Sequence, residues 1–309
     1  MPVRSRPIPP IIPDRTLPLA TGAQTSTESG GISRASTVAV MNVYDSDFEW
    51  PAGTKIASLR IIQVLPKTTN PPNQPRIGVA EQTNARAVLG TVPVEADGSA
   101  HFEAPAGKEI YFQALDQRGM AMQSMRSGTY VHPGERLTCR GCHERKTGAP
   151  LSFERTPLAL RRPASKIQPD VDGANPFNFV RLVQPVLDRH CVECHQKERA
   201  VDLRGLKEGP HGWTRSYTSL AGKHGFYFHV GNGAINTGVH GGSRTIVGQF
   251  GARAAPLLRY LDDRHYGVKL SNEELHRVVL WLDCNSEFFG SYENTDLQAR
   301  GEVAWPTLD

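Results

Sequence analysis

No apolar run in this chain of 309 residues approaches the ~20 residues that a membrane-crossing helix requires, so we predict no membrane span. The chain also lacks a strong excess of either charge, because 35 Lys and Arg stand against 31 Asp and Glu, a net charge of +4. An excess this small, scattered along the sequence, argues against a nucleic-acid-binding protein. Length and composition instead fit a soluble globular protein with room for two domains.

The beginning of the chain lacks a visible secretory signal. Such a signal has a basic start followed by an apolar stretch of about 7–15 residues, whereas six prolines interrupt residues 1–20. A run rich in Ser, Thr and Gly follows them. We therefore predict that residues 1–35 form a disordered or linker arm, since this composition buries too little apolar surface to order itself.

Cysteine is scarce, and four of the five cysteines stand in two short strings, Cys139-Arg-Gly-Cys142-His143 and Cys191-Val-Glu-Cys194-His195. The C-x-x-C-H pattern is typical of covalently attached c-type haem. Two thiols one turn apart add to the two porphyrin vinyl groups, and the next imidazole becomes the proximal iron ligand. A zinc site built from both C-x-x-C pairs is the alternative, but it leaves both histidines unexplained. We predict two haem c groups, with zinc the less favoured cofactor.

The predicted cofactor also bears on localisation. In bacteria covalent haem is attached outside the cytoplasm, where disulfides are also permitted. We therefore expect a periplasmic or other extracytoplasmic compartment. Because no export signal is visible, our hypothesis is that the chain is a C-terminal piece of a longer exported protein.

The overall prediction is an α+β fold in which a β-rich domain comes first. Residues 36–165 contain short apolar segments with period-two alternation, which favour a small β-sandwich-like domain. Asp97-Gly98 is a hairpin turn signal between two of these segments. Regularity fades after residue 117, so the first haem motif is expected in a loop.

Residues 166–309 are predicted to form a mainly helical, cytochrome c-like domain that carries the second haem motif. A helix is expected over residues 179–190 with a kink near Pro185. Residues 203–250 are rich in Gly and His with little periodicity, which favours a long loop around a cofactor. A short helix is expected over residues 256–262, and a capping box of Ser271 and Glu274 opens the last helix.

Several strings resemble the C-terminal region of planctomycete-type hydrazine synthase alpha-subunit-like proteins: Thr129-Tyr-Val-His-Pro-Gly-Glu-Arg136, the first haem motif, Gly251-Ala-Arg-Ala-Ala-Pro256, His265-Tyr-Gly-Val-Lys-Leu-Ser271 and Trp281-Leu-Asp-Cys-Asn285. The resemblance implies further domains upstream, including a β-propeller. It also implies a catalytic haem whose iron is ligated by a Tyr shortly after the motif, with the motif His on zinc. Here Glu144-Arg-Lys-Thr-Gly148 contains no Tyr, so hydrazine synthesis does not transfer and His143 is expected to bind iron.

The expected iron ligands follow from the motifs and the resemblance. His143 and His195 are the proximal ligands of the two haems. The sixth-ligand candidates are His132 for the first haem, with Met120, Met122 and Met125 as alternatives, and His265 for the second haem, with His276 as the alternative. The choice matters because two strong axial ligands favour electron transfer, whereas an open position admits a substrate.

Three functions remain open at this point. The favoured one is a dihaem electron-transfer module that exchanges electrons with a redox partner protein or with an upstream domain or subunit of a larger complex. The second is a haem-dependent oxidoreductase that acts on a small nitrogen compound at the first haem. The third is a haem-bearing docking module of a larger complex.

Overall fold

The computed structural model describes residues 36–80, 83–142, 155–196, 201–228, 230–231, 234–235 and 245–307. Residues Arg34–Asp309 belong to one compact unit. Within it, strands and helices are mixed, which confirms the predicted α+β class. The predicted boundary between residues 165 and 166 stays a prediction, as does a separate cytochrome c-like domain after it.

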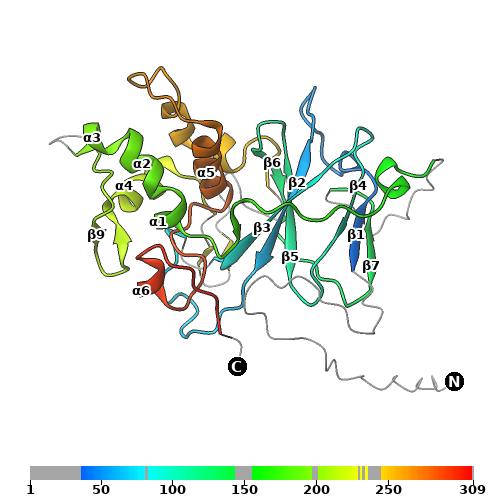
Figure 1. The fold of residues 1–309 in the computed structure, drawn as a ribbon, viewed down its shortest axis with the longest axis horizontal. Coiled ribbons are helices and arrows are strands. Elements are labelled where there is room, and N and C mark those ends of the chain that lie inside the picture. The colour runs from blue at the N-terminus through cyan, green and yellow to red at the C-terminus, as the bar shows by residue number, and fades with distance from the viewer. Residues whose placement is uncertain are drawn as a thin grey trace. The chain divides into compact units, whose positions relative to one another are not determined.

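Two sheets, of four and three strands, make up most of the β part of the described chain (Figure 1), and two further sheets have two short strands each. The larger is antiparallel with the order β3-β2-β5-β6, formed by Arg86–Pro93, Ser58–Val64, Ile110–Leu115 and Ala121–Ser124. The smaller has the order β4-β1-β7, formed by Ala100–Glu103, Thr37–Val40 and Arg136–Cys139. In the smaller sheet β1 is antiparallel to β4 but parallel to β7, so the strand that ends at the first haem motif lies beside the first strand of the unit.

The larger sheet is a buried middle layer. One face packs on the smaller sheet, where Phe102 and Phe112 meet edge to face with ring centroids 5.6 Å apart. The other face packs on the helices. Successive side chains of a strand point to opposite faces, and β2 shows this directly: Ile61 joins the core between the sheets and Ile62 joins the helical core.

The remaining elements are short. The helices are α1 Phe179–Leu182, α2 Gln184–His190, α3 Val192–His195, α4 Arg215–His224, α5 Asn272–Asp283 and α6 Thr295–Gln298, with 3₁₀ turns η1 Leu158–Arg161, η2 Gly251–Arg253 and η3 Pro256–Tyr260. The minor strands are β8 Val171–Ala174, β9 Lys207–Glu208, β10 Trp213–Thr214, β11 Val230–Gly231 and β12 Ala234–Ile235.

Two local predictions are confirmed. Ser271 and Glu274 form a reciprocal capping box at the start of α5. The helix expected over 179–190 is broken at Val183 into α1 and α2, and Pro185 occupies the first turn of α2, where its missing N–H costs nothing.

Two other predictions are wrong. The turn at Asp97-Gly98 is present, but β3 before it and β4 after it pair in different sheets, so it is a connection between layers and not a hairpin. The segment 203–250 is not one loop, because it contains α4, whose N-terminus is capped by the Thr214 side chain. The sequence hides this helix because its apolar residues are few, so periodicity is weak.

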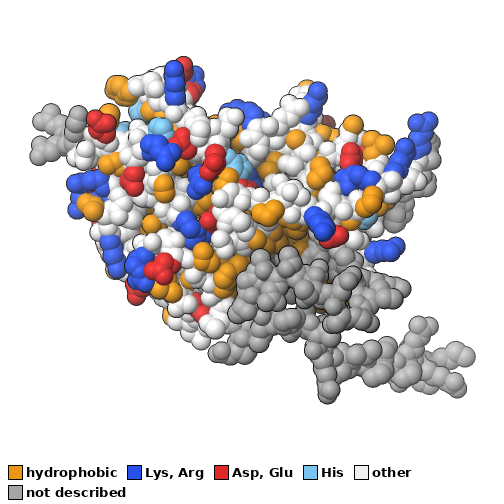
Figure 2. All heavy atoms as spheres, in the orientation of Figure 1, with side chains coloured by type: hydrophobic (Ala, Val, Ile, Leu, Met, Phe, Trp, Pro, Cys, Tyr) orange, Lys and Arg blue, Asp and Glu red, His pale blue; other side chains and the backbone are white. Residues whose placement is uncertain are grey.

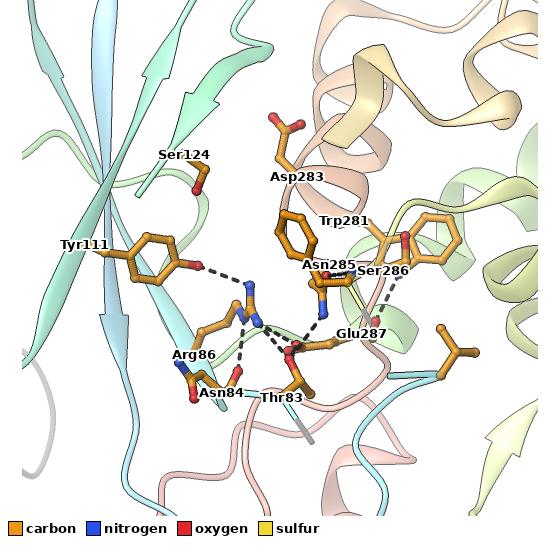
Figure 3. A network of polar contacts seen from close by, with 12 residues as sticks. Thr83, Asn84, Arg86, Tyr111, Ser124, Trp281, Asp283, Asn285, Ser286 and Glu287 are labelled. Atoms are coloured by element: carbon orange, nitrogen blue, oxygen red, sulfur yellow. Dashed lines mark hydrogen bonds and ion pairs between the residues drawn. The ribbon is translucent and has the colours of Figure 1, made fainter. Parts of the chain in front are cut away.

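Buried charges tie the middle sheet to the end of α5. Arg60 on β2 and Asp283 on α5 form a fully buried ion pair at 2.9 Å. Figure 3 shows a second network, in which Arg86 on β3 contacts Glu287 at 2.6 Å and the Tyr111 hydroxyl at 3.1 Å. Burial raises the pKa of Glu287 to about 7, against the opposing effect of Arg86. These pairs fix the C-terminal end of α5 on the sheet.

Candidate haem sites

The second C-x-x-C-H motif lies on a short helix at the end of a helical run. Cys191 is the N-cap of α3, and Cys194 and His195 lie within it. The Cys191 side chain is half-buried against the helical core, whereas Cys194 is exposed. Positions three apart on a helix share a face, so both thiols are presented together. Burial, and next the neighbouring Cys194, raise the pKa of Cys191 to about 11, so this group is a neutral thiol.

The imidazole of His195 is held in one orientation by the backbone. Its Nδ1 lies 3.0 Å from the carbonyl oxygen of Val201. A carbonyl only accepts hydrogen bonds, so Nδ1 carries the proton and Nε2 keeps a free lone pair. This is the arrangement in which a histidine binds a metal through Nε2 while its other nitrogen is fixed by a second group.

The structure brings His195 and His265 together although 70 positions separate them in the sequence. Their ring centroids are 6.1 Å apart, with the ring planes inclined by 36°. A metal–imidazole bond is about 2 Å long and the ring centre lies about 1 Å behind the nitrogen, so imidazoles on opposite sides of one iron have centres about 6 Å apart. The observed spacing fits two axial ligands of one haem iron.

The alternative ligand, His276, is engaged elsewhere. Its Nε2 lies 2.7 Å from the Asp170 carboxylate, and its ring lies beside Gly119, which follows the larger sheet's strand β5. Although burial works in the opposite direction, the hydrogen bond and charge of His276 lower the pKa of Asp170. His276 therefore joins α5 to the sheet rather than facing His195.

The first motif begins at the end of β7, not in an isolated loop. Cys139 pairs with Val40 in the parallel register, and its carbonyl accepts a hydrogen bond of 2.9 Å from the backbone N–H of Met41. Both Cys139 and Cys142 are half-buried against the core between the sheets. His143, the predicted proximal ligand of this motif, lies outside the described residues.

The loop before β2 fixes the first motif from the side. The Arg140 guanidinium pairs with the Asp45 carboxylate. At Gly141 a Cβ atom would lie 1.9 Å from the Asp45 carbonyl oxygen, a distance that no side chain tolerates. The close approach of two backbones therefore requires glycine at this position of the motif.

The predicted sixth ligands of the first haem lie in different places relative to its cysteines. The carbonyl of His132 accepts a hydrogen bond from Ser36, just before β1, whereas Cys139 pairs at the far end of β1, so a four-residue strand separates the two backbone positions by about 10 Å. Met120 is buried in the helical core. Met122 is buried in the core between the sheets, against which Cys139 and Cys142 also pack, and Met125 is half-buried against both cores. Which of these side chains serves the first haem stays a prediction.

The two cysteine pairs lie at opposite ends of the described unit, with the larger sheet between α3 and β7 (Figure 1). They do not converge on one four-cysteine zinc site. Nor does any group of three or more His, Cys, Asp or Glu side chains suited to a metal occur among the described residues. Among the other described histidines, His211 packs on Trp213 and His224 on Tyr260.

Two contributors to the second site were not foreseen from the sequence. One is the Val201 carbonyl. Every residue has a backbone carbonyl, so no residue type in the sequence indicates this contact. The other is Tyr260, whose ring lies edge-on to His265 at 5.3 Å. Its position five residues before a candidate ligand is the only sequence signal, and it is a weak one.

Charged side chains of both signs are mixed over the described part of the face of the molecule that Figure 2 shows. Among the described residues no helix is long and apolar enough to cross a membrane.

Comparisons with known proteins agree on one relationship. The model of the hydrazine synthase alpha subunit middle domain matches residues 54–144, which hold β2 to β7 and the first motif. Hydrazine synthase subunit alpha of Kuenenia stuttgartiensis is 23% identical over 190 residues, 44% of this chain and 24% of that protein. The solved structure of hydrazine synthase from the same organism gives a TM-score of 0.54 at 18% identity and covers 83% of this chain and 43% of that chain. The chain thus spans about a quarter of its curated relative. Residues 54–144 match the hydrazine synthase alpha subunit middle domain, and the chain is similar to that subunit in sequence and in fold.

Proposed function

We propose that this chain binds two covalent haem c groups and that the site at Cys191 and Cys194 is a six-coordinate electron-transfer site between His195 and His265. The single observation that carries the proposal is the 6.1 Å spacing of the two imidazoles. A haem bound there supplies one-electron transfer. The protein's part is to hold both axial nitrogens in place.

The residues around this site support transfer rather than catalysis. The Val201 carbonyl fixes the tautomer of His195. His265 sits in a tight turn, where its backbone N–H bonds to Asp262 at 3.1 Å and its carbonyl accepts from Val268 at 3.1 Å. A haem held by both His195 and His265 would leave no iron position for a substrate.

The first motif supports a second candidate function, a haem-dependent oxidoreductase acting on a small nitrogen compound. The specific observation is the separation of His132 from Cys139 along β1 and β7. If no described side chain fills the sixth position opposite His143, a small ligand has access to it.

The setting of the chain is also a proposal. Its curated relative is a subunit by name, so we infer that this chain, too, works within a larger assembly or beside an upstream domain. The two C-x-x-C-H motifs support an extracytoplasmic compartment for it. Its partner there is a redox protein, with no role for nucleic acid.

The test uses the full chain, produced with a c-type haem maturation system. Intact mass should show two attached haems, and the EPR spectrum of the ferric protein should contain a low-spin signal. His265→Ala should convert that signal to high-spin, whereas His276→Ala, a matched change at the alternative ligand, should not. A protein without haem, or one in which only His276→Ala removes the signal, would contradict the proposed site.

The same preparation tests the oxidoreductase candidate. Cyanide or nitric oxide should bind a high-spin fraction that disappears when Cys139 and Cys142 are both replaced by Ala. If the wild-type protein binds neither ligand, the oxidoreductase candidate is wrong and the chain is an electron carrier at both haems.

A further inference from the structure

The ring of Tyr260 lies against two histidines from different segments, His265 and His224. It lies edge-on to His265, with centroids 5.3 Å apart and planes at 74°, and edge-on to His224, at 5.9 Å and 80°. Tyr260 is the last residue of η3, which Leu257 anchors in the helical core, and His224 ends α4. The contact therefore links the His265 turn to two packed elements.

The turn around His265 has little other support. Asp263, Arg264, Tyr266 and Gly267 are exposed, and Tyr266, the other aromatic neighbour of His265 at 5.1 Å, is 95% exposed. Within the described part of the chain, the imidazole of His265 has ring contacts only with His195, Tyr260 and Tyr266. Of these three, Tyr266 belongs to the turn, His195 is the facing histidine on α3, and Tyr260 is the neighbour that ends η3.

We propose that Tyr260 is a positioning residue for His265, fixing the plane of this imidazole relative to that of His195. The inference rests on the proposed function of the same site. An edge-to-face aromatic contact raises the population of molecules with the His265 ring in this orientation, relative to those with the ring moved away, by roughly two- to tenfold. The plane in question is inclined by 36° to that of the His195 imidazole.

The plane angle is open to measurement. The EPR g values of a ferric low-spin haem respond to the angle between its axial imidazoles, and moderately inclined planes give a resolved rhombic signal. Without the Tyr260 ring, His265 can rotate and detach. The signal should then broaden and shift, and a high-spin fraction should grow by roughly two- to tenfold.

The experiment compares Tyr260→Leu with Tyr260→Phe in the holoprotein. Phe keeps the ring and should leave the spectrum and the reduction potential unchanged, while Leu should change both. Tyr130→Leu is the matched control, because Tyr130 is 46% exposed against 43% for Tyr260 and likewise contacts a histidine, His132, but far from this site. Haem content by mass confirms that each variant is loaded.

The outcomes separate the two proposals. The second haem's signal is the one that His265→Ala removes. If that signal exists and Tyr260→Leu leaves its g values and potential as in the wild type, the positioning role is wrong and the ligand assignment stands. If no signal depends on His265, the proposed function itself fails, whatever the Tyr260 variants do.

Discussion

Replacing Asp283 with Ala should destabilise the chain more than any other single change to a charged side chain that we consider. Asp283 accepts hydrogen bonds from Arg60 at 2.9 Å and from the backbone N–H groups of Ala121 at 3.1 Å and Ala252 at 2.9 Å. Both members of the ion pair are fully buried. The change removes the partner of a buried guanidinium and leaves two N–H groups unsatisfied.

The magnitude follows from that burial. Removing one member of a buried ion pair costs about 3–5 kcal/mol. This is a large part of the free energy of unfolding of a typical domain, which is roughly 5–15 kcal/mol. Burial raises the pKa of Asp283 in spite of Arg60, so desolvation of the pair is costly in itself. Replacing both members by apolar residues should therefore cost less than the sum of the single changes, with a coupling of about 2–3 kcal/mol.

The assay is urea unfolding followed by tryptophan fluorescence, for Asp283→Ala, Arg60→Met and the double variant. At a slope of about 2–3 kcal/mol per molar urea, each single change should lower the midpoint by about 1–2 M. The control is Asp262→Asn, which breaks an exposed pair with Arg264 and should leave the unfolding midpoint almost unchanged. A loss below about 1 kcal/mol for Asp283→Ala, or additive single changes, would refute the reasoning.

Two further predictions concern backbone fit and helix capping. Gly141→Ala should destabilise the protein by about 1–3 kcal/mol and reduce haem attachment at the first motif, because the new Cβ meets the Asp45 carbonyl. The control is Gly222→Ala on α4, where a Cβ has nothing within 4 Å and should stabilise the protein by about 0.5–1 kcal/mol. Urea unfolding measures both changes in stability, and intact mass measures the attached haem. Glu274→Gln should cost about 1 kcal/mol at neutral pH. Hydrogen bonds from the Ser271 backbone, and next from His190, lower the pKa of Glu274 from 4.5 to about 2, so its contribution is complete above pH 4.5 and is lost as the pH falls towards 2. Unfolding curves of wild type and variant should converge over that range; a constant difference would show that capping by the carboxylate is not the cause.

Local features of this protein could be predicted because neighbouring residues encode them. The capping box at Ser271 needs only the hydroxyl, the Glu three residues later and the helix they begin. The strand segments follow from alternation, which is a local pattern as well. The two C-x-x-C-H motifs predict covalent haem attachment from five neighbouring residues each.

Features that depend on distant segments could not be predicted in the same way. Asp97-Gly98 has the sequence of a hairpin turn, yet the chain crosses there from one sheet to the other, because β4 gains more by pairing with β1. Helix α4 was missed because its stability comes from packing of Tyr217 and Leu220 in the core rather than from its own propensity.

The sequence by itself determined the spacing within the two C-x-x-C-H motifs and the capping box that begins α5, since these depend on residues a few positions apart. Only the tertiary structure decided that the ring of His265 lies 6.1 Å from the ring of His195, because the 70 positions between them include helix α4 and packing that no local pattern records. It also decided that Arg60 and Asp283, 223 positions apart, share one buried site. Charges so far apart in sequence meet only when the layers of the fold bury them together.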